Sequence, residues 1–164
     1  MKKAYLDASA FFKIFFGEAG AEYMEQVLEL AKQKKLILVI SDWVENECMW
    51  AAMKKHDDEK ITKQDAFMII NLMADTVENG LENGYINSYT ANEKVIVASR
   101  VLIEEGVMHA SDALHVTIAV TSGCDYFITA DKDITARIRE LKLSIKTVYI
   151  HEKQEIDKFL GDFR

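Results

Sequence analysis

The sequence contains no proline and only two cysteines, Cys48 and Cys124, in 164 residues. A disulfide framework would need more cysteines in a smaller chain, and no Cys-x-x-Cys pair is present. We therefore predict that both cysteines are buried free thiols. The chain also lacks low-complexity stretches and internal repeats, so no segment reads as a linker. A single domain over residues 1–164 is expected.

Long apolar runs and an excess of positive charge are missing as well. No run reaches the ~20 apolar residues of a membrane span, and the apolar stretch before Asp7 is too short for a signal peptide. We expect a cytoplasmic protein with no membrane partner. The net charge is −7, whereas proteins that coat nucleic acid are usually basic. An enzyme that contacts phosphate through local cations is still compatible with this charge.

Apolar residues make up 49% of the chain, and their spacing alternates between strand-like and helix-like patterns. Strands are predicted at 4–6, 36–40, 84–89, 126–129 and 144–150. Helices are predicted at 21–35, from Ser41 or Asp42 to about Lys55, and at 62–77, 92–105, 109–121, 133–141 and from 152 onward. Strands that alternate with helices predict an α/β fold with a mainly parallel sheet covered on both sides.

Two of the predicted helices have distinctive apolar patterns. The helix at 62–77 is amphipathic, with an inward face of Ala66, Phe67, Ile70, Met73, Ala74 and Val77. The helix at 109–121 is apolar almost all round from Ala113 to Val120, which predicts a central, buried position.

Two acids follow strands. Asp7 comes directly after the first predicted strand, and Asp131 comes two residues after the fourth. The carboxyl ends of parallel strands meet at one edge of a sheet, where sites form, so these acids are expected to be neighbours. An Asp at such a position also commonly caps the next helix. Both interpretations stay open, although Asp133 is better placed than Asp131 to cap its helix, and Ser9 could serve as the cap in place of Asp7.

A third acid, Asp112, lies in the first turn of the buried helix at 109–121. Ser111 is available to cap that helix, which leaves Asp112 without a capping role. A carboxylate there is favoured by the helix dipole, but its desolvation is costly without a nearby cation. His115 lies three residues later on the same helical face. It is either a metal ligand or, more ordinarily, a histidine packed in the core.

The fourth acid is chosen between Glu45 and Glu47, whose spacing of two places them on different faces of the helix. Glu47 shares a face with Trp43 and is predicted to turn inward, and Glu45 is predicted to face solvent. Clustered carboxylates repel one another unless a cation neutralises them. Oxygen ligands suit Mg²⁺ or Mn²⁺, and such ions typically serve phosphodiester chemistry.

The chain resembles the PIN-domain nucleases, especially the short VapC-type toxins. The resemblance spans nearly the whole chain, and it is carried by residues 5–9, by Ser41 with Glu47, by Ser111-Asp-Ala-Leu-His115 and by Phe127-Ile-Thr-Ala-Asp-Lys-Asp133. It implies a three-layer α/β/α sandwich and a Mg²⁺- or Mn²⁺-dependent endoribonuclease that hydrolyses RNA. It also implies a homodimer and, for a toxin, a small antitoxin partner.

Carried over by position, the resemblance assigns both catalysis and metal binding to Asp7, Glu47, Asp112 and Asp131. It assigns accessory roles to Ser9, Thr129 and Asp133.

Two features depart from the family pattern. The stretch from 55 to 87 is longer than in the compact toxins and carries an extra amphipathic helix, and the net charge is acidic. The candidates for phosphate contact are Lys13, Arg100, Lys132 and Arg137, each of which also reads as a solvated surface charge. The alternative function is a catalytically silent PIN-like module that binds RNA or protein.

Overall fold

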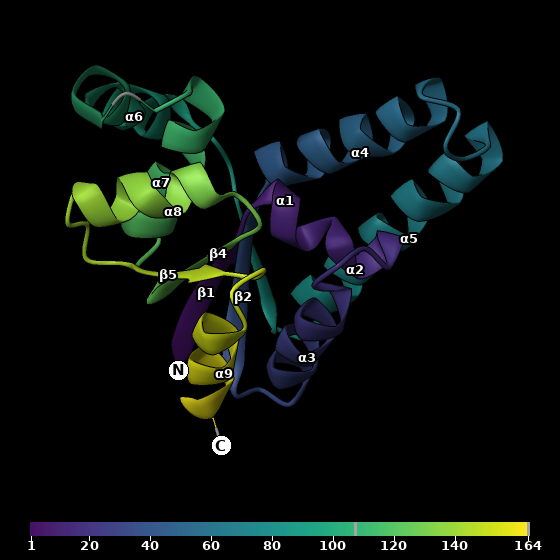
Figure 1. The fold of residues 1–164 in the computed structure, drawn as a ribbon, viewed down its shortest axis with the longest axis horizontal. Coiled ribbons are helices and arrows are strands. Elements are labelled where there is room, and N and C mark those ends of the chain that lie inside the picture. Colours follow the sequence, from purple (N-terminus) through teal and green to yellow (C-terminus); the bar gives the residue numbers. More distant parts are fainter. Residues whose placement is uncertain (107, 164) are drawn as a thin grey trace.

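A computed structural model describes residues 1–106 and 108–163 (Figure 1). The central sheet consists of β1 (Lys2–Leu6), β2 (Leu36–Ser41), β3 (Ile86–Tyr89), β4 (Tyr126–Thr129) and β5 (Lys146–Tyr149). Its strand order is β3-β2-β1-β4-β5, and every neighbouring pair is parallel. The predicted α/β fold with a mainly parallel sheet is confirmed.

Helices cover both faces of the sheet. They are α1 (Ala8–Phe11), α2 (Lys13–Phe16), α3 (Ala21–Lys32), α4 (Asp42–Asp57), α5 (Lys63–Glu82), α6 (Glu93–Gly106), α7 (Ala110–Thr121), α8 (Lys132–Glu140) and α9 (Lys153–Gly161). Figure 1 shows α1 to α5 on one side of the sheet and α6, α7 and α8 on the other, while α9 returns to the side of α3. The molecule is therefore a three-layer α/β/α sandwich.

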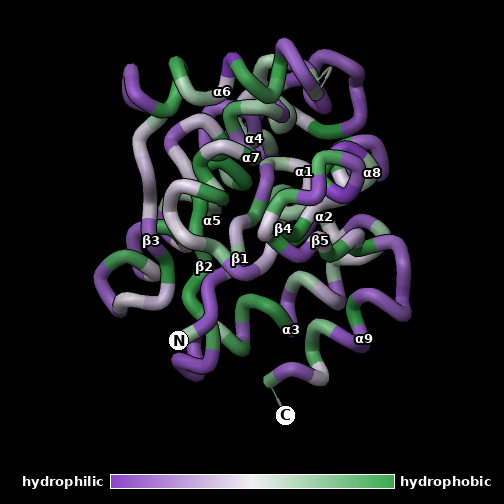
Figure 2. Tube along the Cα trace, turned by 90° about the vertical axis from the view of Figure 1, so that its left-hand side faces the viewer, coloured by the Kyte–Doolittle hydropathy of each residue, from purple (hydrophilic) through white to green (hydrophobic). Residues whose placement is uncertain are grey.

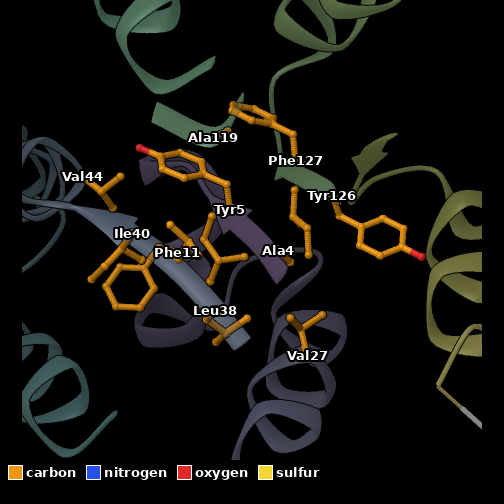
Figure 3. Close-up of a cluster of buried hydrophobic side chains, with 14 of the residues drawn as sticks. Ala4, Tyr5, Phe11, Val27, Leu38, Ile40, Val44, Ala119, Tyr126 and Phe127 are labelled. Atoms are coloured by element: carbon orange, nitrogen blue, oxygen red, sulfur yellow. The ribbon is translucent and has the colours of Figure 1, made fainter. Parts of the chain in front are cut away.

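The core lies on both faces of β1, β2 and β4, as their apolar runs predict. Tyr5 and Phe127 point toward α7, where Ala119 lies, whereas Leu38 points toward Val27 of α3 (Figure 3). All five of these side chains are fully buried. Figure 2 shows β2 as a largely hydrophobic segment within the molecule. Because successive side chains of a strand alternate between faces, each central strand contributes to both halves of the core.

Several predicted helix features differ in the structure. The helix predicted at 21–35 ends at Lys32, because Lys34 adopts a left-handed backbone with φ of 58°. The helix predicted at 62–77 extends to Glu82, and Phe67, which we predicted to face inward, is 50% exposed. Ala74 is also exposed. Figure 1 shows α4 and α5 as a hairpin that projects from the sheet, so only a narrow stripe of α5 finds a packing partner.

Both cysteines are buried free thiols, as predicted. Within residues 1–106 and 108–163, no helix combines the length and the apolar character that crossing a membrane requires.

Candidate active site

Four acidic side chains from four segments line one pocket of about 290 Å³: Asp7, Glu47, Asp112 and Asp131. Asp7 follows β1 and Asp131 follows β4, while Glu47 lies in α4 and Asp112 in the first turn of α7. The chain crosses from β1 to β2 and β3 in one direction and returns to β4 and β5 in the other. The pocket thus lies at the carboxyl edge where the winding reverses, the usual location of a site in such sheets.

Asp7 is the most tightly held of the four acids, and its side chain is only 3% exposed. Its Oδ1 accepts hydrogen bonds from the Ala10 N–H at 2.9 Å and the Ser9 hydroxyl at 2.8 Å. The Thr129 hydroxyl donates to its Oδ2 at 2.6 Å. Burial raises the pKa of the Asp7 carboxyl, and these donors oppose that rise. Asp7 therefore sits where a nearby cation would stabilise its charged form.

Ser9 and Thr129 also tie the ends of β1 and β4 together. The Ser9 Oγ accepts from the Ala130 N–H at 2.9 Å, and the Thr129 Oγ1 accepts from the Asp131 N–H at 2.9 Å. Each hydroxyl therefore accepts from the β4 end and donates to the carboxylate at the β1 end. This arrangement fixes the position of Asp131 relative to Asp7.

Asp131 caps α8, which corrects the prediction that Asp133 is the better cap. Its Oδ1 accepts from the N–H groups of Asp133 at 2.7 Å and Ile134 at 3.3 Å. Asp133 lies in the first turn of α8, exposed to solvent. Asp7 likewise caps α1. Capping and lining the pocket are thus combined in the same two residues, because a helix begins directly after each strand at this edge.

Glu47 is held from two sides. The Trp43 Nε1–H donates to its Oε1 at 2.9 Å, and the Nε2 atom of His115 lies 2.8 Å from its Oε2. The other ring nitrogen of His115, Nδ1, lies 2.8 Å from the Tyr5 hydroxyl, which in turn lies 3.0 Å from Ser41 Oγ. Trp43 is 41% exposed, whereas the residues of the hydrogen-bonded series behind Glu47, which are His115, Tyr5 and Ser41, are buried.

The directions of these hydrogen bonds follow from the available donors and acceptors. The Val44 N–H donates to Ser41 Oγ at 3.3 Å, so the Ser41 hydroxyl can donate to Tyr5 and the Tyr5 hydroxyl to Nδ1 of His115. Nε2 of His115 then donates to the carboxylate of Glu47. Every group in the chain finds a partner in this single direction, so the buried residues orient Glu47 toward the pocket.

His115 is therefore a buried histidine with two partners, in line with the more ordinary of the two predictions, and it also borders the pocket. Sequence reasoning did not identify Tyr5 and Ser41 as part of the site. Tyr5 reads as an ordinary strand residue, and Ser41 lies 36 positions away from it. The apolar run around Tyr5 gives no sign that its hydroxyl is needed.

Asp112 is partly buried at the start of α7, and the charges of Asp131 and His115 act on the pKa of its carboxyl in opposite directions. Burial raises the pKa of the Asp112 carboxyl, and the nearby charge of Asp131 raises it further. The predicted cap at Ser111 is wrong: the cap residue of α7 is His109, and it makes no side-chain capping bond. The Ser111 hydroxyl lies instead 3.5 Å from Oδ1 of Asp112. Asp112 remains free of a capping role.

Glu45 does not face solvent as predicted. It lies in a second, smaller pocket between α4 and α5, beside Met49 and Met73. Burial raises the pKa of its carboxyl, with a further contribution from Asp42. The error arises because the α5 helix packs against the face of α4 that a lone helix would leave in water.

The oxygen atoms of the pocket suit a hard divalent cation. Within the part of the chain that the structure describes, no three acid, histidine or cysteine side chains stand close enough to hold one ion jointly. Mg²⁺ usually keeps several waters and is bound through one or two carboxylates, so a closed cage is not required. The donor set therefore fits an ion that is held partly through water, by Asp7 with Asp112, Glu47 or Asp131.

The cations predicted to contact phosphate have different environments. Lys13 is buried and paired with Glu18 at 3.3 Å, so it is neither a surface charge nor available to a substrate. Arg137 pairs with Glu140 at 2.8 Å. Arg100 and Lys132 are exposed.

Comparison with known proteins identifies the family. The PIN-domain family profile matches residues 4–141, a range that includes all four acids of the pocket. The chain belongs to the PIN-domain family. PIN domains are generally nucleases, and they typically use divalent metal ions. No curated protein sequence matches the chain significantly.

Solved structures share the PIN fold over most of the chain. The Pyrobaculum aerophilum protein PAE2754 has a TM-score of 0.64 and 16% identity, and the match covers 98% of this chain and 90% of that one. Mycobacterium tuberculosis VapC20, a toxin that cleaves the sarcin–ricin loop, has a TM-score of 0.56, 12% identity, and coverage of 81% and 93%. VapBC2 from Rickettsia felis, bound to a promoter DNA fragment, has a TM-score of 0.54, 14% identity, and coverage of 88% and 96%.

Proposed function

We propose that this PIN-domain protein is a Mg²⁺- or Mn²⁺-dependent endoribonuclease in which Asp7, Glu47, Asp112 and Asp131 hold the metal and carry catalysis. The proposal rests on one observation: four carboxylates from four segments line the same pocket at the carboxyl edge of the sheet. Carboxylates gathered in this way repel one another unless a cation compensates their charge. At Asp112, burial and then the charge of Asp131 raise the pKa of the carboxyl.

The residues of the chain divide the work in this proposal. A bound divalent ion supplies Lewis acidity toward a phosphoryl oxygen and lowers the pKa of a bound water. Asp7 provides a fixed ligand, because Ser9 and Thr129 hold both of its oxygens. Glu47 is oriented by His115 and Trp43. Asp133, exposed beside Asp131, is proposed to act through water.

The test is Mn²⁺-dependent cleavage of total RNA. Asp7→Asn and Asp112→Asn should each lower the cleavage rate by about 10³-fold or more, as for groups that act in the transition state. Asp75→Asn is the matched control, because Asp75 is an exposed carboxylate on α5 away from the pocket, and it should cut like the wild type. Full activity in a clean Asp112→Asn preparation would refute the mechanism. RNA that stays intact with the wild type would favour the silent binding module.

We further propose that the protein is the toxin of a toxin–antitoxin pair and forms a homodimer. The support for the toxin role is the fold shared with VapC20 and VapBC2. The support for the homodimer is α6, where Ile96, Val97 and Val101 are about half exposed, since exposed apolar helix faces commonly mark protein contacts. Growth arrest on expression, relieved by a co-expressed upstream antitoxin, tests the first role. Sedimentation of Val97→Glu beside the wild type tests the second, and a monomeric wild type would refute it.

A further inference from the structure

An exposed tryptophan stands at the edge of the acidic pocket. Trp50 of α4 is 64% exposed, although tryptophan has one of the largest apolar surfaces of any side chain. It lines the same pocket as the four acids, next to Ala51 and near Phe12. The pocket therefore has a charged part, formed by the acids, and an aromatic part that is open to solvent.

A lysine accompanies the tryptophan. The Nζ atom of Lys54, one helical turn after Trp50, lies 4.9 Å from the centroid of the Trp50 ring. A cation at this distance over an aromatic ring is attracted to it, which keeps the ammonium group beside the Trp50 ring. The chain carries a net charge of −7, so a polyanion needs such a local cation to approach the acids.

We propose that Trp50 stacks on an unpaired nucleobase of an RNA substrate, while Lys54 contacts a neighbouring phosphate. This contact builds on the proposed nuclease function, because it places a nucleotide beside the acids. A flat aromatic ring with an adjacent cation is the combination that binds single-stranded nucleic acid without strong sequence preference. A base inside a duplex already stacks on both of its neighbours, so the contact selects single-stranded RNA or a loop.

The chain offers a matched control on the other helix of the same hairpin. Phe67 of α5 is 50% exposed, and Lys63 Nζ lies 5.8 Å from its ring centroid. This pair repeats the exposed aromatic ring and its lysine, but it does not line the acidic pocket. A general effect of removing an exposed aromatic residue would appear equally at Phe67 and at Trp50.

The experiment measures binding of a fluorescent single-stranded RNA of about eight nucleotides to the full chain in EDTA, where no cleavage takes place. Trp50→Ala should weaken binding about tenfold, the equivalent of about 1.4 kcal/mol. Trp50→Phe should retain most of the affinity, and Phe67→Ala should bind like the wild type. Lys54→Gln should weaken binding, and the slope of log affinity against log salt concentration should become less steep by about one, the value for one lost phosphate contact.

Four results would overturn the contact. They are equal losses in Trp50→Ala and Phe67→Ala, equal affinity of wild type and Trp50→Ala, binding of duplex RNA as tight as single-stranded RNA, and no RNA binding at all. A change of oligomeric state in Trp50→Ala with unchanged RNA affinity would assign the surface to a second copy instead. If Trp50→Ala loses affinity but the wild type cuts no RNA with Mn²⁺, the nuclease proposal fails and the contact stands. If the wild type cuts RNA with Mn²⁺ but Trp50→Ala keeps full affinity, the contact is refuted and the nuclease proposal stands.

Discussion

Replacing Tyr5 by Phe tests whether the buried chain of hydrogen bonds behind Glu47 is as complete as the structure indicates. The substitution removes one oxygen atom and leaves the ring in place, stacked on Phe127 with centroids 5.5 Å apart. The lost hydroxyl makes two buried hydrogen bonds, to His115 Nδ1 at 2.8 Å and to Ser41 Oγ at 3.0 Å. No cavity larger than a hydroxyl group results.

The magnitude follows from the groups that are left behind. Each lost hydrogen bond contributes about 1 kcal/mol, and a buried group without a partner costs about 1–3 kcal/mol. Because both partners are buried, we expect Tyr5→Phe to lower the free energy of unfolding by about 2–4 kcal/mol. A typical domain has about 5–15 kcal/mol of stability, so the variant should still fold.

Tyr126→Phe is the matched control, since Tyr126 lies on the neighbouring strand β4 and also uses its hydroxyl. That hydroxyl contacts Lys2 at 3.1 Å and Asp162, whose side chains are 42% and 36% exposed. Water replaces the lost contacts there, so the expected loss is below about 1 kcal/mol. Urea unfolding measures both variants, with an unchanged slope showing that only stability has altered.

The same comparison reports on the orientation of Glu47. If the chain of hydrogen bonds holds that carboxylate for a cation, Tyr5→Phe should weaken Mn²⁺ binding by about tenfold, measured by calorimetry, while Tyr126→Phe leaves it unchanged. Equal unfolding free energies for Tyr5→Phe and Tyr126→Phe would refute the reasoning, because they would mean that the Tyr5 hydroxyl has no partner whose loss matters.

Thr129→Val should lower the free energy of unfolding by about 1.5–3 kcal/mol, because the hydroxyl bonds a buried carboxylate. Thr135→Val, which loses a bond to a backbone carbonyl, should lower it by about 1 kcal/mol. The reverse order in urea unfolding would contradict this reasoning. The pKa of Asp112 is raised in the folded state, so its carboxyl stabilises the metal-free fold fully below its unfolded pKa and loses that contribution as the pH rises through its folded pKa. The free energy of unfolding of the wild type relative to Asp112→Asn should therefore fall as the pH rises above about 4, and a difference that does not change with pH in thermal unfolding would count against it. Gly80→Ala should lower the free energy of unfolding by about 1–3 kcal/mol, since its new Cβ would lie 2.4 Å from atoms of the Ile86 side chain. Gly161→Ala, whose new Cβ meets nothing within 4 Å, should be neutral or slightly stabilising in the same thermal unfolding experiment.

Local patterns in the sequence were sufficient to predict the class of fold and some of the residues that line the pocket. Apolar runs of strand length and helical periods identified each of the five strands that the structure describes, and the alternation that makes the sheet parallel. Asp7 and Asp131 could be placed at one edge because each follows a strand within two residues. Glu47 was chosen over Glu45 because it shares a helical face with Trp43 that was predicted to turn inward. Glu47 does line the pocket, although Trp43 itself is 41% exposed.

Packing between elements decided what those patterns left open or predicted wrongly. Glu45 is covered because α5 packs against its side of α4. Phe67 is exposed because the α4–α5 hairpin projects from the sheet and leaves that face of α5 without a packing partner. No pattern of a single helix carries information about which of its faces a second helix will cover.

The four acids themselves are the clearest case of this division. The sequence specified which acids stand at strand ends and helix starts, because those positions are set by neighbouring residues. It treated capping and lining the pocket as alternatives, whereas Asp7 and Asp131 do both. Only the tertiary structure brings Tyr5, 110 positions from His115, into contact with it and so fixes the orientation of Glu47. Hydrogen bonds across such separations depend on how strands and helices pack, which no local pattern encodes.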